Sequence, residues 1–149
     1  PLWNITGIDI SQDALIVAQE NAERNHVQVT WKLLDILSED LDSIDIIVSN
    51  PPYIKECERE QMEHNVLDWE PKLALFVPDD DPLLFYRTIV QRAIDGLLKP
   101  NGHLYFEVNR EHGSETAHLL EKVGFTDVQL LKDLSGNERI VKGIRKIMP

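Results

Sequence analysis

The first half of the chain contains three short segments with the apolar pattern of strands and one segment whose apolar residues have helical spacing. Residues 5–10 predict a short buried strand that ends in Asp9, and residues 44–49 are apolar enough for a central strand of a parallel sheet. Residues 27–33 alternate apolar with polar side chains and predict another strand. After the first run, Ser11 can cap a helix that extends to about Arg24. The apolar stripe of this helix consists of Ala14, Leu15, Ala18 and Ala22.

The second half predicts two further helices and three strands. A strongly periodic helix spans residues 86–97, and Pro100 with Asn101-Gly102 ends it. A second helix begins with a cap at Ser114 and closes at Gly124. The strands are His103–Val108, Thr126–Leu131 and Arg139–Ile144, and a turn at Asp133–Asn137 joins the last two. This order predicts an α/β fold with a doubly wound, mostly parallel sheet and a C-terminal antiparallel hairpin.

A long, mostly polar connection, residues 54–81, separates the two halves. Structureless stretches of this size inside a compact domain are usually lids or binding loops. Trp69 and Glu70 place a ring beside an acid, as the wall of a substrate site would. The alternative interpretation is that Trp69, Leu73, Leu75 and Phe76 only anchor the loop to the core. The sequence leaves both interpretations open.

Composition narrows the class of protein. The 149 residues suffice for one domain with a real core, and no apolar run approaches the length of a membrane span. A single cysteine, Cys57, excludes an intrachain disulfide and predicts a cytoplasmic location. The five histidines share no ligand spacing, so no metal is expected. With 15 basic residues against 26 acidic ones and a net charge of −11, the chain lacks the positive surface of a duplex-binding protein.

The segment Asn50-Pro51-Pro52-Tyr53 follows the strand at 44–49 and carries the most specific chemistry. Two consecutive prolines remove two backbone donors and fix two φ angles, so the carbonyls of Asn50 and Pro51 lie in a stiff segment with no ladder partner. An amide precedes the prolines and an aromatic ring follows them. Acceptors for two N–H bonds together with a covering ring suit a planar amino group. Open α/β sheets bind their ligands at this end of a strand.

The start of the chain lacks one expected feature. A dinucleotide-type site has a Gly-rich turn roughly 20 residues before the ribose-binding acid, but only eight residues precede Asp9. We therefore expect an N-terminally truncated or degenerate domain.

Several segments in order resemble one known family. Residues 6–11 (TGIDIS), Ala14-Leu15, Ala18 and Asn21 resemble the second strand and helix of class I S-adenosylmethionine methyltransferases. Residues 45–54 (DIIVSNPPYI) narrow the resemblance to the HemK-like protein-glutamine methyltransferases, which methylate a glutamine amide in peptide-chain release factors. Further matching pieces are Glu70-Pro71, Ala74-Leu75, Phe85-Tyr86-Arg87, Asp133-Leu134, Gly136 and Arg139. The resemblance implies that residues 1–149 are the C-terminal part of a class I methyltransferase catalytic domain.

The resemblance implies S-adenosylmethionine as cofactor, with Asp9, Ile10, Asp35 and Asn50 as cofactor-binding residues. Asp9 would accept hydrogen bonds from the ribose, and Asp35 would lie near the adenine, which Leu34 and Ile36 would line. The implied catalytic set is Asn50, Pro51, Pro52 and Tyr53, with Asn50 holding the amide nitrogen and Tyr53 packing on its plane. This chain has Asn109 and His112 where the family usually has glycine and then glutamine, which leaves open whether Glu107 does more than anchor a strand end.

Two other functions remain as alternatives. The same tetrapeptide occurs in enzymes that methylate amino groups of adenine or guanine, although the acidic composition favours a protein substrate, the release factor, over nucleic acid. The chain could also be a truncated domain that is inactive by itself. We expect impairment, because a missing first strand would expose two strand edges that can pair with another chain. No membrane partner is expected.

Overall fold

The computed structural model describes residues 3–62 and 71–146, which divide into two compact units between Leu41 and Asp42. The predicted pieces Trp69 and Glu70 lie outside the described residues. Each unit is described below by itself. Within the described ranges, no helix combines the length and the apolar character needed to span a membrane.

The first unit is a strand–helix–strand motif formed by β1 (Thr6–Asp9), α1 (Gln12–Arg24) and β2 (Thr30–Leu33). The strands are parallel, with Thr6 paired to Thr30 and Asp9 to Leu33. The predicted cap is confirmed, because the Ala14 N–H donates to Ser11 Oγ at 3.3 Å. The buried residues of this unit are Leu15, Ala22 and Leu34.

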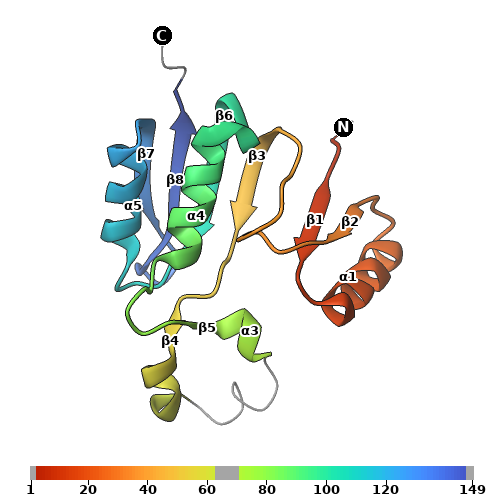
Figure 1. Ribbon diagram of the computed structural model, residues 1–149, viewed down its shortest axis with the longest axis horizontal. Helices are drawn as coiled ribbons and strands as arrows, with labels where there is room; N and C mark the ends of the chain where they lie inside the picture. The colour runs from red at the N-terminus through yellow and green to blue at the C-terminus, as the bar shows by residue number, and fades with distance from the viewer. Residues whose placement is uncertain (1–2, 63–70, 147–149) are drawn as a thin grey trace. The chain divides into compact units, whose positions relative to one another are not determined.

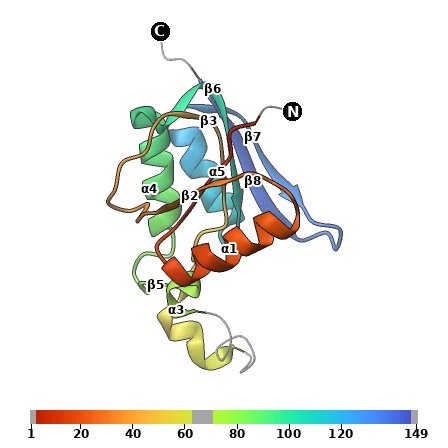
Figure 2. The same ribbon diagram turned by 90° about the vertical axis from the view of Figure 1, so that its right-hand side faces the viewer.

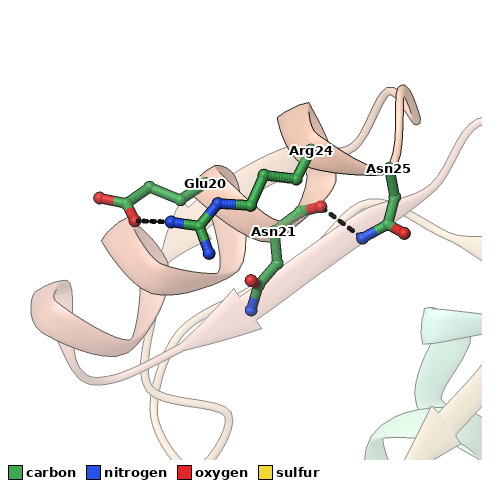
Figure 3. A network of polar contacts seen from close by, with 4 residues as sticks. All are labelled: Glu20, Asn21, Arg24 and Asn25. Atoms are coloured by element: carbon green, nitrogen blue, oxygen red, sulfur yellow. Dashed lines mark hydrogen bonds and ion pairs between the residues drawn. The ribbon is translucent and has the colours of Figure 1, made fainter.

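The carboxyl end of α1 is fixed by polar contacts (Figure 3). Arg24 Nη2 donates to Glu20 Oε2 at 3.3 Å, and Asn25 Nδ2 donates to the Asn21 carbonyl at 2.8 Å. The Val27 N–H donates to the Ala22 carbonyl at 3.0 Å, so Val27 belongs to the helix end. The strand predicted from residue 27 is therefore shorter, since β2 begins only at Thr30.

The second unit contains a four-stranded sheet in the order β3-β6-β8-β7. These strands are β3 (Ile44–Ser49), β6 (Leu98–Glu107), β7 (Phe125–Lys132) and β8 (Glu138–Arg145). β3 and β6 are parallel, whereas β8 is antiparallel to both β6 and β7. The predicted β3 and the C-terminal hairpin are confirmed. Among the described residues β3 pairs only with β6 and is an edge strand of this sheet, although its composition is typical of a central strand.

Helices α4 (Leu84–Arg92) and α5 (Gly113–Lys122) cover one face of this sheet (Figures 1 and 2). The core between them and the strands contains Tyr86, Ile89, Val90, Ala93, Leu104, Phe106, Val108, Thr116, Leu120 and Val141. The chain leaves α4 through a π-helical turn, η2 (Ala93–Leu97), where Gly96 has φ 130°. β6 begins directly at Leu98, earlier than predicted, and accommodates the expected turn residues as an irregularity with Asn101 at φ 61°.

The predicted cap at Ser114 is wrong. α5 begins at Gly113 after His112, because the His112 N–H donates to the Asn109 carbonyl at 3.0 Å and turns the chain one residue earlier. The predicted closure is confirmed, since Gly124 has φ 92°, a left-handed conformation that glycine adopts without strain.

The predicted structureless connection contains short regular elements. It comprises β4 (Ile54–Lys55), the 3-10 helix η1 (Glu56–Gln61), α3 (Lys72–Leu75) and β5 (Phe76–Val77). β4 and β5 pair in parallel, Ile54 with Phe76 and Lys55 with Val77. They lie beyond the carboxyl end of β3 (Figure 1). The connection therefore begins with a two-stranded sheet directly after Tyr53.

Candidate active site

In the first unit, the two predicted acids lie at the carboxyl ends of two neighbouring parallel strands. Asp9 is the last residue of β1, and the Leu34 N–H donates to its carbonyl at 3.0 Å, just before Asp35. The Ser11 N–H donates to Asp9 Oδ1 at 2.8 Å. Asp35 is engaged on both oxygens, by the Leu37 N–H at 2.8 Å and by Ser38 Oγ at 3.1 Å. Both carboxylates are therefore oriented by local turns.

The surroundings of Asp9 fit a ribose and an aromatic base. Within the described residues its Oδ2 has no hydrogen-bond partner, so it can accept from a hydroxyl group. Ile10 is 54% exposed beside it and Leu33, at the end of the neighbouring strand, is 55% exposed. Leu34 is buried in the core of the unit and Ile36 is half-buried. Leu33 had no role at this site predicted from the sequence, because the sequence did not indicate that the side chain at the end of this strand is exposed.

In the second unit, Asn50 follows the last residue of β3, and register places it opposite the end of β6. Ser49 pairs with Phe106, and the β6 strand ends one residue later at Glu107. Asn50 is exposed and Pro51 is buried, while Pro52 and Tyr53 are half-buried. Within the described part of the chain, neither the Asn50 side chain nor the Pro51 carbonyl has a hydrogen-bond partner. Both acceptors are therefore available, as the two prolines predicted.

Polar contacts fix the base of the connection after Tyr53. The Cys57 N–H donates to Asp79 Oδ1 at 2.8 Å, and this carboxylate raises the pKa of the exposed Cys57 thiol. The Arg59 guanidinium lies 5.9 Å from the centroid of the Phe76 ring. Val77 is 2% exposed and anchors the segment, whereas Leu73 is 72% exposed. Of the expected anchoring residues that the structure describes, Leu75 and Phe76 are half-buried and Leu73 is exposed, so the expected set anchors this connection only in part.

The sequence placed Tyr86 at the start of a periodic helix and within the matching piece Phe85-Tyr86-Arg87, but it assigned the residue no role of its own. Its hydroxyl donates to the Glu107 carbonyl at 3.0 Å, and its ring meets Phe106 edge-on at 5.1 Å between centroids. Burial raises the pKa of Tyr86 above its ordinary value, and Tyr53 and then Glu107 raise it further. The usable signal was the hydroxyl itself, because a tyrosine on a buried helix face needs a hydrogen-bond partner.

In residues 3–62 and 71–146, no three His, Cys, Asp or Glu side chains are placed so that they could hold a metal ion.

Comparison with solved structures identifies the fold as that of methyltransferases. A methyltransferase from Pyrococcus furiosus superposes with a TM-score of 0.64 at 18% identity, over 97% of this chain and 64% of that one. The ribosomal protein L11 methylase from Lactobacillus delbrueckii gives 0.61 at 19% identity, over 97% and 58%. A family model described as a RMKL-like methyltransferase domain matches residues 1–68.

Sequence comparison is more specific. Proteins named release factor glutamine methyltransferase match from Bacteroides thetaiotaomicron, 49% identical over 92% of this chain, and from Flavobacterium psychrophilum, 49% identical over 95%. The match from Streptococcus pneumoniae is 42% identical over 95%. The chain belongs to the family of these proteins, which confirms the resemblance, and it spans about half the length of the curated relatives it matches.

Proposed function

We propose that this chain takes part in transferring a methyl group from S-adenosylmethionine to the side-chain amide nitrogen of a glutamine in a peptide-chain release factor. The observation that carries the proposal is the segment after β3, where the Asn50 side chain is exposed and the Pro51 carbonyl has no partner among the described residues. The names of the relatives, at 49% identity, support the substrate.

The two acceptors address the main difficulty of the reaction. An amide nitrogen is a weak nucleophile, because its lone pair is delocalised into the carbonyl. Asn50 Oδ1 and the Pro51 carbonyl accept its two N–H bonds and fix its direction, and this positioning lowers the barrier without a metal or a strong base. Tyr53 packs on the amide plane, and Pro52 keeps the segment extended. When bound, S-adenosylmethionine supplies an electrophilic methyl group.

Three of the four proposed cofactor residues, Asp9, Ile10 and Asp35, belong to the first unit. Asp9 offers a free carboxylate oxygen to ribose hydroxyls, and exposed Ile10 offers apolar surface to the base. Asp35 acts near the adenine amino group, and Asn50 contributes to cofactor binding as well as to catalysis. The same acceptors would fit an adenine amino group in nucleic acid, but a net charge of −11 gives little counterpart to a phosphate backbone.

Calorimetric titration with S-adenosylmethionine tests the cofactor residues. We expect Asp9→Ala to weaken binding about tenfold or more, as for the loss of hydrogen bonds to a charged group. Asp13→Ala, which removes an exposed acid from the first turn of α1, is the matched control and should bind like the wild type. Equal affinity of the wild type and Asp9→Ala would contradict the assignment.

Transfer of a labelled methyl group to intact release factor, followed by mass spectrometry of its peptides, tests the substrate. The label should appear on one glutamine, and Asn50→Ala should lower kcat by about 100-fold, the cost of losing one preorganised hydrogen-bonding group. An oligonucleotide offered in parallel should stay unlabelled. Methylation of the oligonucleotide in place of the protein would favour the nucleic-acid alternative.

A further inference from the structure

The carbonyl of Glu107, the last residue of β6, points to a place where β3 has no backbone N–H that could donate to it. The Val108 N–H donates to the Arg139 carbonyl of β8 at 2.9 Å. Successive residues of a strand direct their backbone groups to opposite sides, so the N–H and carbonyl of Glu107 point toward β3. Because Ser49 pairs with Phe106, Glu107 lies opposite Asn50. In a parallel ladder the Glu107 carbonyl would then accept from the N–H of the next residue, Pro51. Proline has no N–H.

Tyr86 fills this gap from outside the sheet. Its hydroxyl donates to the Glu107 carbonyl at 3.0 Å, and the whole residue is 0% exposed. The donor therefore comes from α4, which packs on the sheet face, and not from the Asn50–Tyr53 segment. That segment keeps its own carbonyls free as acceptors.

We propose that Tyr86 is a positioning residue for methyl transfer: its hydroxyl replaces the missing N–H of Pro51 and holds the end of β6 beside the Asn50–Tyr53 segment. The proposal rests on the proposed function, because it concerns the same acceptors. It also explains why the site contains tyrosine and not phenylalanine, since the ring contact with Phe106 needs no hydroxyl. The Tyr86 hydroxyl is protonated, and therefore a donor, at neutral pH, and burial raises its pKa further above that range.

Amide hydrogen exchange of Tyr86→Phe, read by mass spectrometry, tests the positioning without any turnover. Loss of one hydrogen bond should speed exchange about tenfold in residues 50–55 and 107–110 and leave the β7–β8 hairpin unchanged. Tyr105→Phe is the control: Tyr105 lies in β6, the strand that carries Glu107, is half-buried, and its hydroxyl has no hydrogen bond among the described residues. It should exchange like the wild type. Unchanged exchange in both segments, or equal acceleration in every strand, would overturn the proposal.

Turnover separates positioning from simple stability. In Tyr86→Phe, kcat for release factor should fall about tenfold while the KM for S-adenosylmethionine stays unchanged, and Tyr105→Phe should alter neither. An unchanged kcat would overturn the positioning role, even if exchange were faster. If the wild type transferred no methyl group, the proposed function would fail, and the exchange experiment alone would decide whether Tyr86 holds the segment.

Discussion

At the scale of single residues, Gly7 shows how closely the first unit is packed beneath its candidate cofactor residues. Gly7 pairs with Trp31 across β1 and β2, two residues before Asp9. A Cβ at Gly7 would lie 2.1 Å from Trp31 Cζ3 and 2.4 Å from Cε3, far inside a normal contact. Glycine is required here by the close approach of the indole ring and not by backbone conformation.

Gly7→Ala should therefore force the Trp31 ring away from β1. We expect a loss of about 1–3 kcal/mol in unfolding free energy, typical of overpacking, and weaker binding of S-adenosylmethionine through displaced Asp9. Thermal unfolding measured in a cycle with Trp31→Ala checks the cause, because Gly7→Ala should cost little once the ring is gone. The same cost in both backgrounds would show that the ring is not responsible.

The individual site residues were predictable to different degrees. Asn50–Tyr53 could be placed from sequence, because prolines after an apolar run limit both backbone shape and donors. The hydrogen bond of Tyr86 could not, because it depends on which side of β6 the Glu107 carbonyl faces. That direction follows from the register of three strands distant in sequence. A pattern of apolar positions does not contain this information.

At the scale of elements, the β7–β8 hairpin depends on one carboxylate. Asp133 Oδ1 accepts the Ser135 N–H at 2.8 Å and the Asn137 N–H at 2.9 Å. These hydrogen bonds, led by that of Asn137, lower the pKa of Asp133, with Arg139 adding a smaller effect in the same direction. The carboxylate thus holds a turn whose neighbour Leu134 is fully exposed.

Asp133→Ala should lower the melting temperature at neutral pH, and the difference from the wild type should shrink in acid. The pKa is lower in the folded than in the unfolded chain, so the unfolded chain binds the proton first as the pH falls. The Asp133 carboxylate therefore contributes its full stabilisation above its pKa in the unfolded chain, about 3.9. This stabilisation disappears as the pH falls below the pKa of Asp133 in the folded chain. Melting curves from pH 7 to about pH 2 measure this. A difference that stays constant with pH would argue against the carboxylate.

Element boundaries show where local pattern and tertiary structure compete. The six residues of β3 were predicted correctly, because an apolar run that Asn50 and two prolines follow leaves little choice. The helix start at Gly113 was not, since the turn at Asn109 decides it and outweighs the capping preference of Ser114. The pairing of β4 with β5 was also missed, because strands of two residues carry no periodicity.

At the scale of the whole molecule, the described sheets leave hydrogen-bonding edges open. β3 pairs only with β6 among the described residues, and its Val48 side chain is 78% exposed. An open edge with apolar side chains is a template for pairing with another strand, whereas like charges on two copies oppose their approach. The net charge of −11 therefore works against association of the edge, and salt weakens this opposition.

We accordingly expect salt to promote self-association of the chain. The Debye length, over which the charges still repel each other, is about 30 Å at 0.01 M salt and about 3 Å at 1 M. Sedimentation velocity should therefore show monomers at the lower salt concentration and larger species at the higher one. Val48→Lys should remain monomeric at both concentrations, because a lysine on an edge strand blocks pairing. Val17→Lys is the matched control: it changes the net charge equally at a side chain on α1 that is 57% exposed, and it should behave like the wild type. If the control abolished association as well, charge and not the strand edge would be responsible, and a wild type that stayed monomeric in high salt would show that β3 is protected.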